Sequence, residues 1–129
     1  MIKEEYNKLS NQIIASSIEV HKELGPGLLE SVYEICLIDE LARRNIKVHN
    51  QVKLPIIYKG KQLEKDFFID LLVEDVIIVE LKSIEIILPV HEVQLLTYLR
   101  LADKKLGLLI NFNVSVLKEG IRRRINGYL

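Results

Sequence analysis

The segment from Phe67 to Ile84 reads FFIDLLVEDVIIVELKSI and decides the fold. Its two apolar runs, separated by Glu74-Asp75, are typical of an antiparallel pair of strands. The second run holds four consecutive β-branched residues, 76–79, which indicates a strand buried on both faces in the middle of a sheet. Charges interrupt these core strands at Asp70, Glu80 and Lys82. Because a buried unpaired charge is costly, these three residues mark a candidate site.

The register between the two strands decides whether these charges meet. Glu80 and Lys82 are two residues apart and therefore share a face of their strand. A two-residue turn at Glu74-Asp75 would place Asp70 and Glu80 on opposite faces. A three-residue connection over 74–76, or a single bulge, would set Asp70 opposite Glu80. We predict one of the latter two arrangements.

The rest of the chain predicts an α/β fold with elements in the order α-α-β-β-β-α-β, a mixed sheet flanked by helices. A Gly-Pro-Gly turn separates the first two helices, and Pro89 suits the first turn of the third. The last strand follows a crossover helix and should lie parallel to its neighbour. The tail after residue 112 is expected to form a short strand or a helical turn. The expected helices are residues 6–24, 28–44 and 89–101, and the expected strands are 48–58, 62–73, 76–79 and 106–112.

Length and composition limit the possible functions. The 129 residues, of which 49% are apolar and 28% charged, predict a single globular domain spanning residues 1–129. The net charge is zero, so binding of nucleic acid would require a local basic patch such as Arg122–Arg124. Cys36 is the only cysteine, which excludes an intrachain disulfide, and no apolar run approaches the length of a membrane span. We expect a cytoplasmic protein without a membrane partner.

Two carboxylates and an ammonium at one sheet edge suit the hydrolysis of a phosphodiester. Mg²⁺ prefers one or two carboxylates together with water and substrate phosphate, and it lowers the pKa of a bound water. Lys82 could orient that water or stabilise the charge that develops on phosphorus. The alternative is a partly exposed salt bridge between neighbouring strands, which contributes at most ~1 kcal/mol.

These residues resemble a known family. The pattern Asp70-x9-Glu80-x-Lys82 in an αβββαβ setting is similar to the PD-(D/E)XK nuclease superfamily, although Ile69 stands where the usual pattern has proline. Residues 27–33, GLLESVY, match the motif of the bacterial GxxExxY proteins within that superfamily. The resemblance extends over essentially the whole chain and implies a restriction-endonuclease-like αβββαβ core.

The resemblance also implies roles for individual residues. Asp70 and Glu80 would bind Mg²⁺ or Mn²⁺, with the backbone carbonyl of Leu81 as a further ligand. Glu30 would complete the acidic cluster, directly or through water, and Lys82 would be the catalytic lysine. Each of these is an expectation from the family's motif at the matching position.

The third helix carries a further resemblance. Gln94 and Tyr98 are similar to the Q-x-x-x-Y motif of RecB-type nucleases and would position the substrate or brace the site. They lie one helical turn apart, so they share a face, but polar helix surface is the alternative. His91, one turn earlier, could approach the site or lie exposed. Glu30 could instead favour the start of its helix dipole, and Tyr33 is expected to be a packed aromatic whose hydroxyl finds a partner.

The leading hypothesis is a metal-dependent nuclease acting on nucleic acid, with DNA as the expected substrate and RNA as the alternative. No recognition module accompanies the core, so specificity would come from the nucleic-acid structure, a protein partner or a homodimer. The competing hypothesis is a non-catalytic binding or assembly module that uses the nuclease fold as a scaffold. A third is another phosphoester or nucleotide hydrolase with the same metal chemistry.

Overall fold

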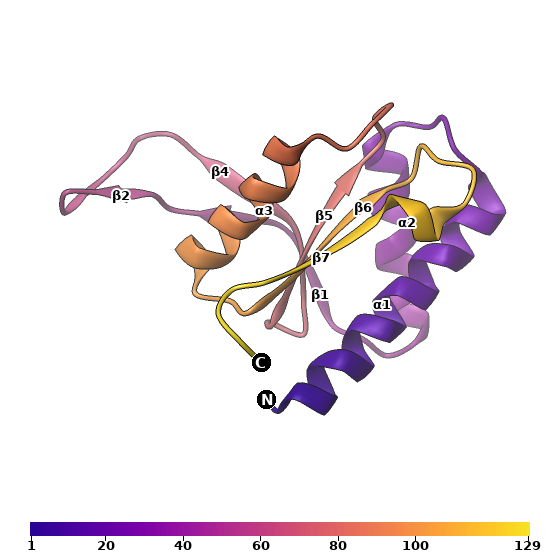
Figure 1. Cartoon of the computed structure of the whole chain (residues 1–129), viewed down its shortest axis with the longest axis horizontal. Coiled ribbons are helices and arrows are strands. Elements are labelled where there is room, and N and C mark those ends of the chain that lie inside the picture. The colour runs from indigo at the N-terminus through magenta and orange to yellow at the C-terminus, as the bar shows by residue number, and fades with distance from the viewer.

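A mixed five-stranded sheet lies between helices in the computed structural model, which describes residues 1–129 (Figure 1). The strand order is β1-β4-β5-β6-β7, and β2 and β3 form a separate two-stranded ribbon. The expected α/β architecture, a restriction-endonuclease-like mixed sheet flanked by helices, is therefore confirmed. The strands are β1 Val48–Leu54, β2 Ile57–Tyr58, β3 Lys61–Gln62, β4 Phe67–Val73, β5 Ile77–Lys82, β6 Leu106–Asn111 and β7 Ile121–Ile125.

Helices cover both faces of the sheet. α1 (Lys3–Leu24) and α2 (Glu30–Arg43) pack on one face, where they form the first core cluster together with alternate residues of β4, β5 and β6. α3 (Pro89–Ala102) packs on the other face and forms the second core cluster with the intervening strand residues. β5 is buried on both faces, as its run of β-branched residues predicted. None of the three helices combines the length and apolarity that a membrane span requires.

β5 and β6 are parallel and joined through α3, whereas the other neighbours in the sheet are antiparallel. The crossover therefore gives the expected parallel pair. The tail, which the sequence left open between two alternatives, contains both: a 3-10 turn at Leu117–Gly120 and the edge strand β7.

The two long strands expected over residues 48–58 and 62–73 are each interrupted. β1 ends at Leu54 and β4 begins at Phe67, while the chain between them forms the β2–β3 ribbon, which projects from the body of the molecule in Figure 1. Pro55, which has no N–H to donate to a ladder, lies at the break. The prediction of a single long hairpin is therefore wrong. The short β2–β3 hairpin extends from the end of the longer β1–β4 hairpin.

The register of β4 on β5 follows the three-residue arrangement. Val73 pairs with Ile77, and Glu74, Asp75 and Val76 form the connection. Both Glu74 and Asp75 adopt left-handed backbone conformations, with φ of 50° and 61°. This register sets the aspartate of the candidate site opposite its glutamate, as predicted.

β1 and β4 exchange faces of the sheet part-way along their length. Val48 packs against the first core cluster, whereas Val52 packs against the second. In β4 the same exchange falls between Ile69, in the second cluster, and Leu71, in the first. Residues two apart on a regular strand share a face, so both strands are twisted over at this point. The exchange coincides with Gln51, whose φ is 50°, and with the aspartate opposite it.

Candidate active site

Asp70 and Glu80 bridge β4 and β5 where the backbone pairing of these strands ends, one step beyond the pair Leu71–Val79. Glu80 Oε2 accepts the backbone N–H of Asp70, and Asp70 Oδ2 accepts the backbone N–H of Leu81, both at 2.8 Å. These two bonds stand in place of the backbone-to-backbone hydrogen bonds that would continue the β4–β5 ladder. The other oxygen of each carboxylate accepts no backbone hydrogen bond, so one oxygen of each remains available to a ligand.

Burial makes Glu80 the most perturbed carboxyl of the site. Its residue is only 7% exposed. Desolvation by this burial, followed by the negative charge of Asp70, raises the pKa of Glu80 from 4.5 to about 8, while the positive charge of Lys82 opposes the shift. Near neutral pH the Glu80 carboxyl therefore holds a proton much of the time. A cation beside it would favour the ionised form.

α3 closes the site from the second face of the sheet. The Gln94 amide nitrogen donates to the Tyr98 hydroxyl at 3.3 Å. Burial, then the charges of Glu80 and Asp70, raise the pKa of Tyr98. Gln94 also lines a cavity with Lys82, which follows Glu80 on β5, and the roles of Gln94 and Tyr98 in the site stay predictions.

Lys82 follows Glu80 on β5 and lines a cavity of about 540 Å³ with His91, Gln94, Thr97 and two valines. Its ammonium forms no ion pair, so the interstrand salt bridge considered as an alternative is absent. His91 also reaches this cavity, but its Nδ1 accepts the backbone N–H of Leu88 at 2.9 Å and caps the start of α3. The cavity thus offers a free cation beside polar side chains of α3.

Glu30 lies at the opposite side of the acidic pair, at the start of α2. It lines a cavity of about 220 Å³ together with Asp70 and Leu81. Its Oε2 accepts the backbone N–H of Ser83 at 3.3 Å, which ties α2 to the chain leaving β5. No three Asp, Glu, His or Cys side chains of the structure converge as a ready-made metal cluster. Any ion held here would therefore depend on water, backbone carbonyl or substrate oxygens as well.

The sequence matches the family model of the PD-(D/E)XK nuclease superfamily over residues 7–124. The chain belongs to this superfamily. No curated protein and no solved structure gives a significant match. Proteins of this superfamily are generally hydrolytic nucleases that use divalent metals. The narrower resemblance to the GxxExxY proteins stays a prediction.

Two side chains beside the acidic pair of this PD-(D/E)XK domain escaped the sequence reasoning. Glu34 and Gln51 line the same cavity as Glu30 and Asp70. The Gln51 amide nitrogen donates to Glu34 Oε1 at 2.7 Å and lies 3.5 Å from Asp70 Oδ1. Glu34 could have been found because it lies one helical turn after Glu30. A lone glutamine in a strand gives no such signal.

Buried polar side chains brace the segments that carry the PD-(D/E)XK residues. The Tyr33 hydroxyl donates to Gly25 O at 2.6 Å and accepts the Leu28 N–H at 3.2 Å, which fixes the turn before Glu30. The Tyr33 ring is fully buried and stacks on Phe112 with centroids 4.4 Å apart. The expected packed aromatic with a satisfied hydroxyl is therefore confirmed.

Asn111 braces the chain on the other side of the site. Its side chain donates to Ile84 O and accepts the Ile84 N–H, both at 3.0 Å, so β6 fixes the segment that follows Lys82. No local pattern marks this asparagine, because both of its partners belong to the backbone of a distant segment.

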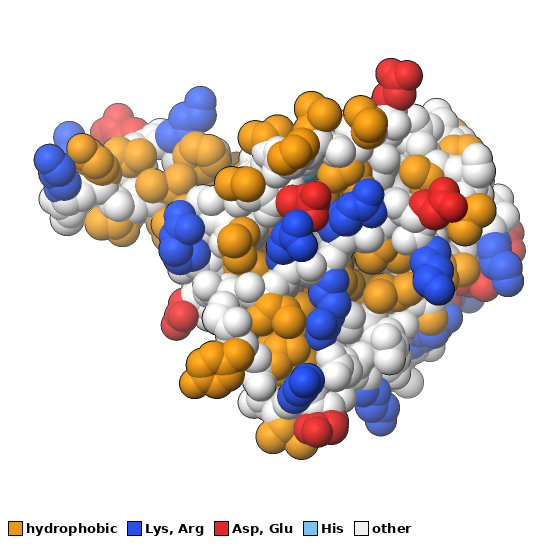
Figure 2. All heavy atoms as spheres, viewed as in Figure 1, with side chains coloured by type: hydrophobic (Ala, Val, Ile, Leu, Met, Phe, Trp, Pro, Cys, Tyr) orange, Lys and Arg blue, Asp and Glu red, His pale blue; other side chains and the backbone are white.

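A basic band crosses the face that carries α3 and β7 (Figure 2). In the sheet register, Glu80 pairs with Leu109 and Leu109 pairs with Arg122. Neighbouring strands are ~4.8 Å apart, so the Arg122 backbone lies about 10 Å from that of Glu80 in the same row. Arg124, two residues on, pairs with Glu92 of α3. The chain, whose net charge is zero, thus places one arginine, Arg122, in the row of the sheet that contains Glu80.

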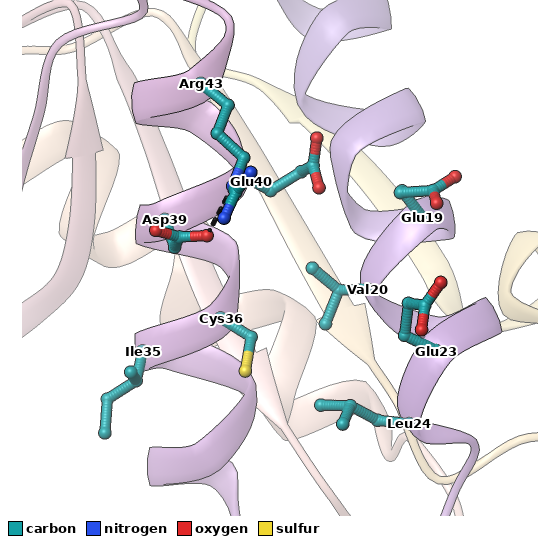
Figure 3. Close-up of a pocket in the computed structure, with 9 residues that line it drawn as sticks. All are labelled: Glu19, Val20, Glu23, Leu24, Ile35, Cys36, Asp39, Glu40 and Arg43. Carbon is teal, nitrogen blue, oxygen red and sulfur yellow. Dashed lines mark hydrogen bonds and ion pairs between the residues drawn. The ribbon is translucent and has the colours of Figure 1, made fainter.

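The largest cavity lies elsewhere, between α1 and α2 (Figure 3). Its volume is about 560 Å³, and Val20, Leu24 and Cys36 form apolar parts of its wall. Asp39 and Arg43 on its rim are joined at 2.7 Å. It shares no lining residue with the two cavities beside the acidic pair. We therefore exclude it from the candidate active site.

Proposed function

We propose that this protein is a Mg²⁺- or Mn²⁺-dependent nuclease that hydrolyses phosphodiester bonds of DNA. The observation that carries the proposal is the relation between Asp70 and Glu80. The three-residue connection places them opposite each other, and each keeps one carboxylate oxygen free of backbone hydrogen bonds. Membership of the PD-(D/E)XK superfamily supports the reaction class.

The donor set of the site fits a hard divalent cation. Asp70 and Glu80 would supply the carboxylate oxygens, the Leu81 carbonyl a further oxygen, and Glu30 a ligand directly or through water. Mg²⁺ is commonly held by one or two carboxylates, with water and phosphate oxygens in the other positions. When bound, such an ion polarises the phosphodiester and increases the acidity of a water molecule.

The other side chains of the site would bind and orient the substrate. Lys82 has no carboxylate partner, so its ammonium is free to stabilise negative charge on a phosphate. The Tyr98 hydroxyl, on the same face of α3 as Gln94, would serve as a hydrogen-bond donor. Gln94 orients that hydroxyl. Arg122 supplies a positive charge along the same row of the sheet and would contact the nucleic-acid backbone.

Calorimetric titration of Mn²⁺ into the purified protein tests the proposal without knowledge of the substrate. We expect saturable binding that disappears in Glu80→Gln and persists in Glu85→Gln, an exposed glutamate close by in the chain with no hydrogen-bond partner. DNA and RNA of several strand forms would then be incubated with Mn²⁺ and the parent or Lys82→Ala. Mn²⁺-dependent cleavage by the parent, absent in Lys82→Ala, is the expected result, and its absence on every substrate would overturn the proposal.

One observation favours a second candidate, a non-catalytic assembly module. The reciprocal hydrogen bonds of Asp70 and Glu80 would hold β4 and β5 together beyond their last backbone pair without any metal. Under this alternative the protein would not bind Mn²⁺, and its interactions would be with a protein partner or a second copy of the chain. The same titration, with light scattering to measure the oligomeric state, distinguishes the two candidates.

A further inference from the structure

Gln51 adopts a backbone conformation that is unusual for a strand. Its φ is 50°, in the left-handed region, although it lies in the middle of β1. On either side of it the ladder is regular, because Asn50 pairs with Leu71 and Val52 pairs with Ile69. Gln51 is therefore opposite Asp70, at the one interruption in the β1–β4 ladder.

This conformation has an energetic cost that other residues would avoid. The left-handed conformation is disfavoured for a residue with a side chain, and glycine or asparagine adopts it much more readily than glutamine. Such strain persists where the surrounding structure enforces it, and it gathers at functional sites. Here the conformation coincides with the point at which β1 and β4 exchange core clusters, which is also the position of Asp70.

The side-chain contacts of Gln51 explain why this strained position holds a glutamine and not a glycine. Its amide nitrogen donates to Glu34 Oε1 at 2.7 Å, and this bond holds the nitrogen 3.5 Å from Asp70 Oδ1. Asp70 Oδ2 is already held by the Leu81 N–H. The amide therefore lies beside the one Asp70 oxygen that is free for a ligand.

We propose that Gln51 is a positioning residue for Asp70. At its left-handed position β1 and β4 exchange faces, which brings the Asp70 carboxylate to the point where the β4–β5 pairing ends, and its amide, held by Glu34, fixes the direction of Oδ1. The inference rests on the proposed function, since it assigns the strain at Gln51 to the orientation of a metal ligand.

Three variants of the full chain separate the effect of the Gln51 backbone conformation from the effect of its side chain. Gln51→Gly removes both the backbone strain and the side-chain amide. In Gln51→Asn the residue tolerates the left-handed backbone, but its side chain is too short to contact both Glu34 and Asp70. Asn50→Gly is the matched control, because Asn50 is exposed and regularly paired. The readouts are the thermal midpoint without metal and the calorimetric affinity for Mn²⁺.

We expect Gln51→Gly to melt at a higher temperature than the parent, whereas Asn50→Gly should melt at a lower one. Both Gln51 variants should bind Mn²⁺ about tenfold more weakly or worse, as is typical when a side chain that orients a metal ligand is removed. Glu34→Ala should weaken Mn²⁺ binding similarly, and Glu34→Gln, which keeps a hydrogen-bond acceptor, should restore most of it.

Two results would overturn this inference while leaving the proposed function in place. One is a parent that binds Mn²⁺ with an affinity that both Gln51 variants retain, and the other is a lower melting temperature for Gln51→Gly. A parent that binds no Mn²⁺ would instead remove the proposed function, and with it the purpose that we assign to Gln51.

Discussion

Glu80 accepts the backbone N–H of Asp70 at 2.8 Å, while the Asp70 carboxylate accepts the N–H of the residue that follows Glu80. Each acidic side chain therefore depends on the other's strand for its orientation. The arrangement holds β4 and β5 at a fixed separation where their backbone pairing ends, while leaving one oxygen of each carboxylate unbonded to backbone. A change at either position should consequently alter both stability and ligand binding.

The pKa of Glu80 predicts how stability depends on pH without metal. Because the pKa rises from 4.5 to about 8 on folding, the folded protein retains a proton between these values that the unfolded chain has lost. The contribution of Glu80 to stability is therefore fully present below about pH 4.5. It falls as the pH rises toward 8, by about 1 kcal/mol per pH unit. Glu80→Gln should flatten this decline in urea unfolding with chelator present. Equal slopes for parent and variant from pH 5 to 8 would contradict the assigned pKa.

Divalent metal should reverse that decline. Mn²⁺ at one hundred times its dissociation constant would stabilise the parent by ~2.7 kcal/mol if it binds only the folded state. At one fixed Mn²⁺ concentration the effect should be larger at pH 8 than at pH 6, because binding requires ionised Glu80. Thermal melts at increasing Mn²⁺ concentration measure it, with Glu80→Gln as the variant expected not to respond. A response that persists in this variant would place the ion elsewhere.

Tyr33→Phe tests the brace in front of α2. The substitution keeps the ring that stacks on Phe112 but leaves Gly25 O and the Leu28 N–H without their partner. Loss of these buried hydrogen bonds should lower the free energy of unfolding by ~1–3 kcal/mol. Tyr6→Phe is a suitable control because the Tyr6 hydroxyl forms no hydrogen bond in the structure. Equal loss in both variants would show that the Tyr33 hydroxyl has no special role.

Gly120 is required because there is no room for a side chain. A Cβ at this position would lie 2.2 Å from the carbonyl oxygen of Asn111. A backbone atom cannot move away as a side chain can, so Gly120→Ala should displace the turn before β7 and lower stability by about 3 kcal/mol or more. At Gly107 a Cβ meets the flexible Leu95 side chain at 2.8 Å, and Gly107→Ala should cost less. Urea unfolding of the two variants gives the order, and the reverse order would contradict this account.

Arg122 is expected to contribute to nucleic-acid binding. Arg122→Ala should weaken binding of catalytically inactive Lys82→Ala protein to DNA and reduce the salt dependence of the affinity by about one phosphate contact. Lys3→Ala, at the start of α1, is the control for loss of one positive charge. Fluorescence anisotropy at several salt concentrations provides the measurement. An unchanged salt dependence would exclude Arg122 from the binding surface.

The sequence predicted those features that follow from short-range patterning. The run of β-branched residues 76–79 identified the central strand, and the charges at Asp70 and Glu80 stood out because they interrupt apolar runs. Even the register followed from an argument about faces, since only a three-residue connection or a bulge brings Asp70 opposite Glu80. These features are encoded within a span of about fifteen residues.

The features that the sequence did not predict depend on long-range contacts. The left-handed backbone of Gln51 coincides with the interruption of the β1–β4 ladder and with the exchange between the two core clusters, and no property of glutamine favours it. Asn111 acts on Ile84, 27 residues away. The split of the long hairpin does have a local signal, because Pro55 lacks an N–H and is therefore unsuited to the middle of a strand.

β7 forms one edge of the sheet and carries three consecutive arginines, Arg122, Arg123 and Arg124. The exposed backbone of an edge strand can pair with the same strand of another molecule, which leads to aggregation. Antiparallel pairing of two β7 strands would bring six guanidinium groups together, and their mutual repulsion opposes such growth of the sheet. The strand that brings positive charge to the row of Glu80 thus also protects the protein against edge-to-edge association. If the chain forms a homodimer, we expect it to use another surface.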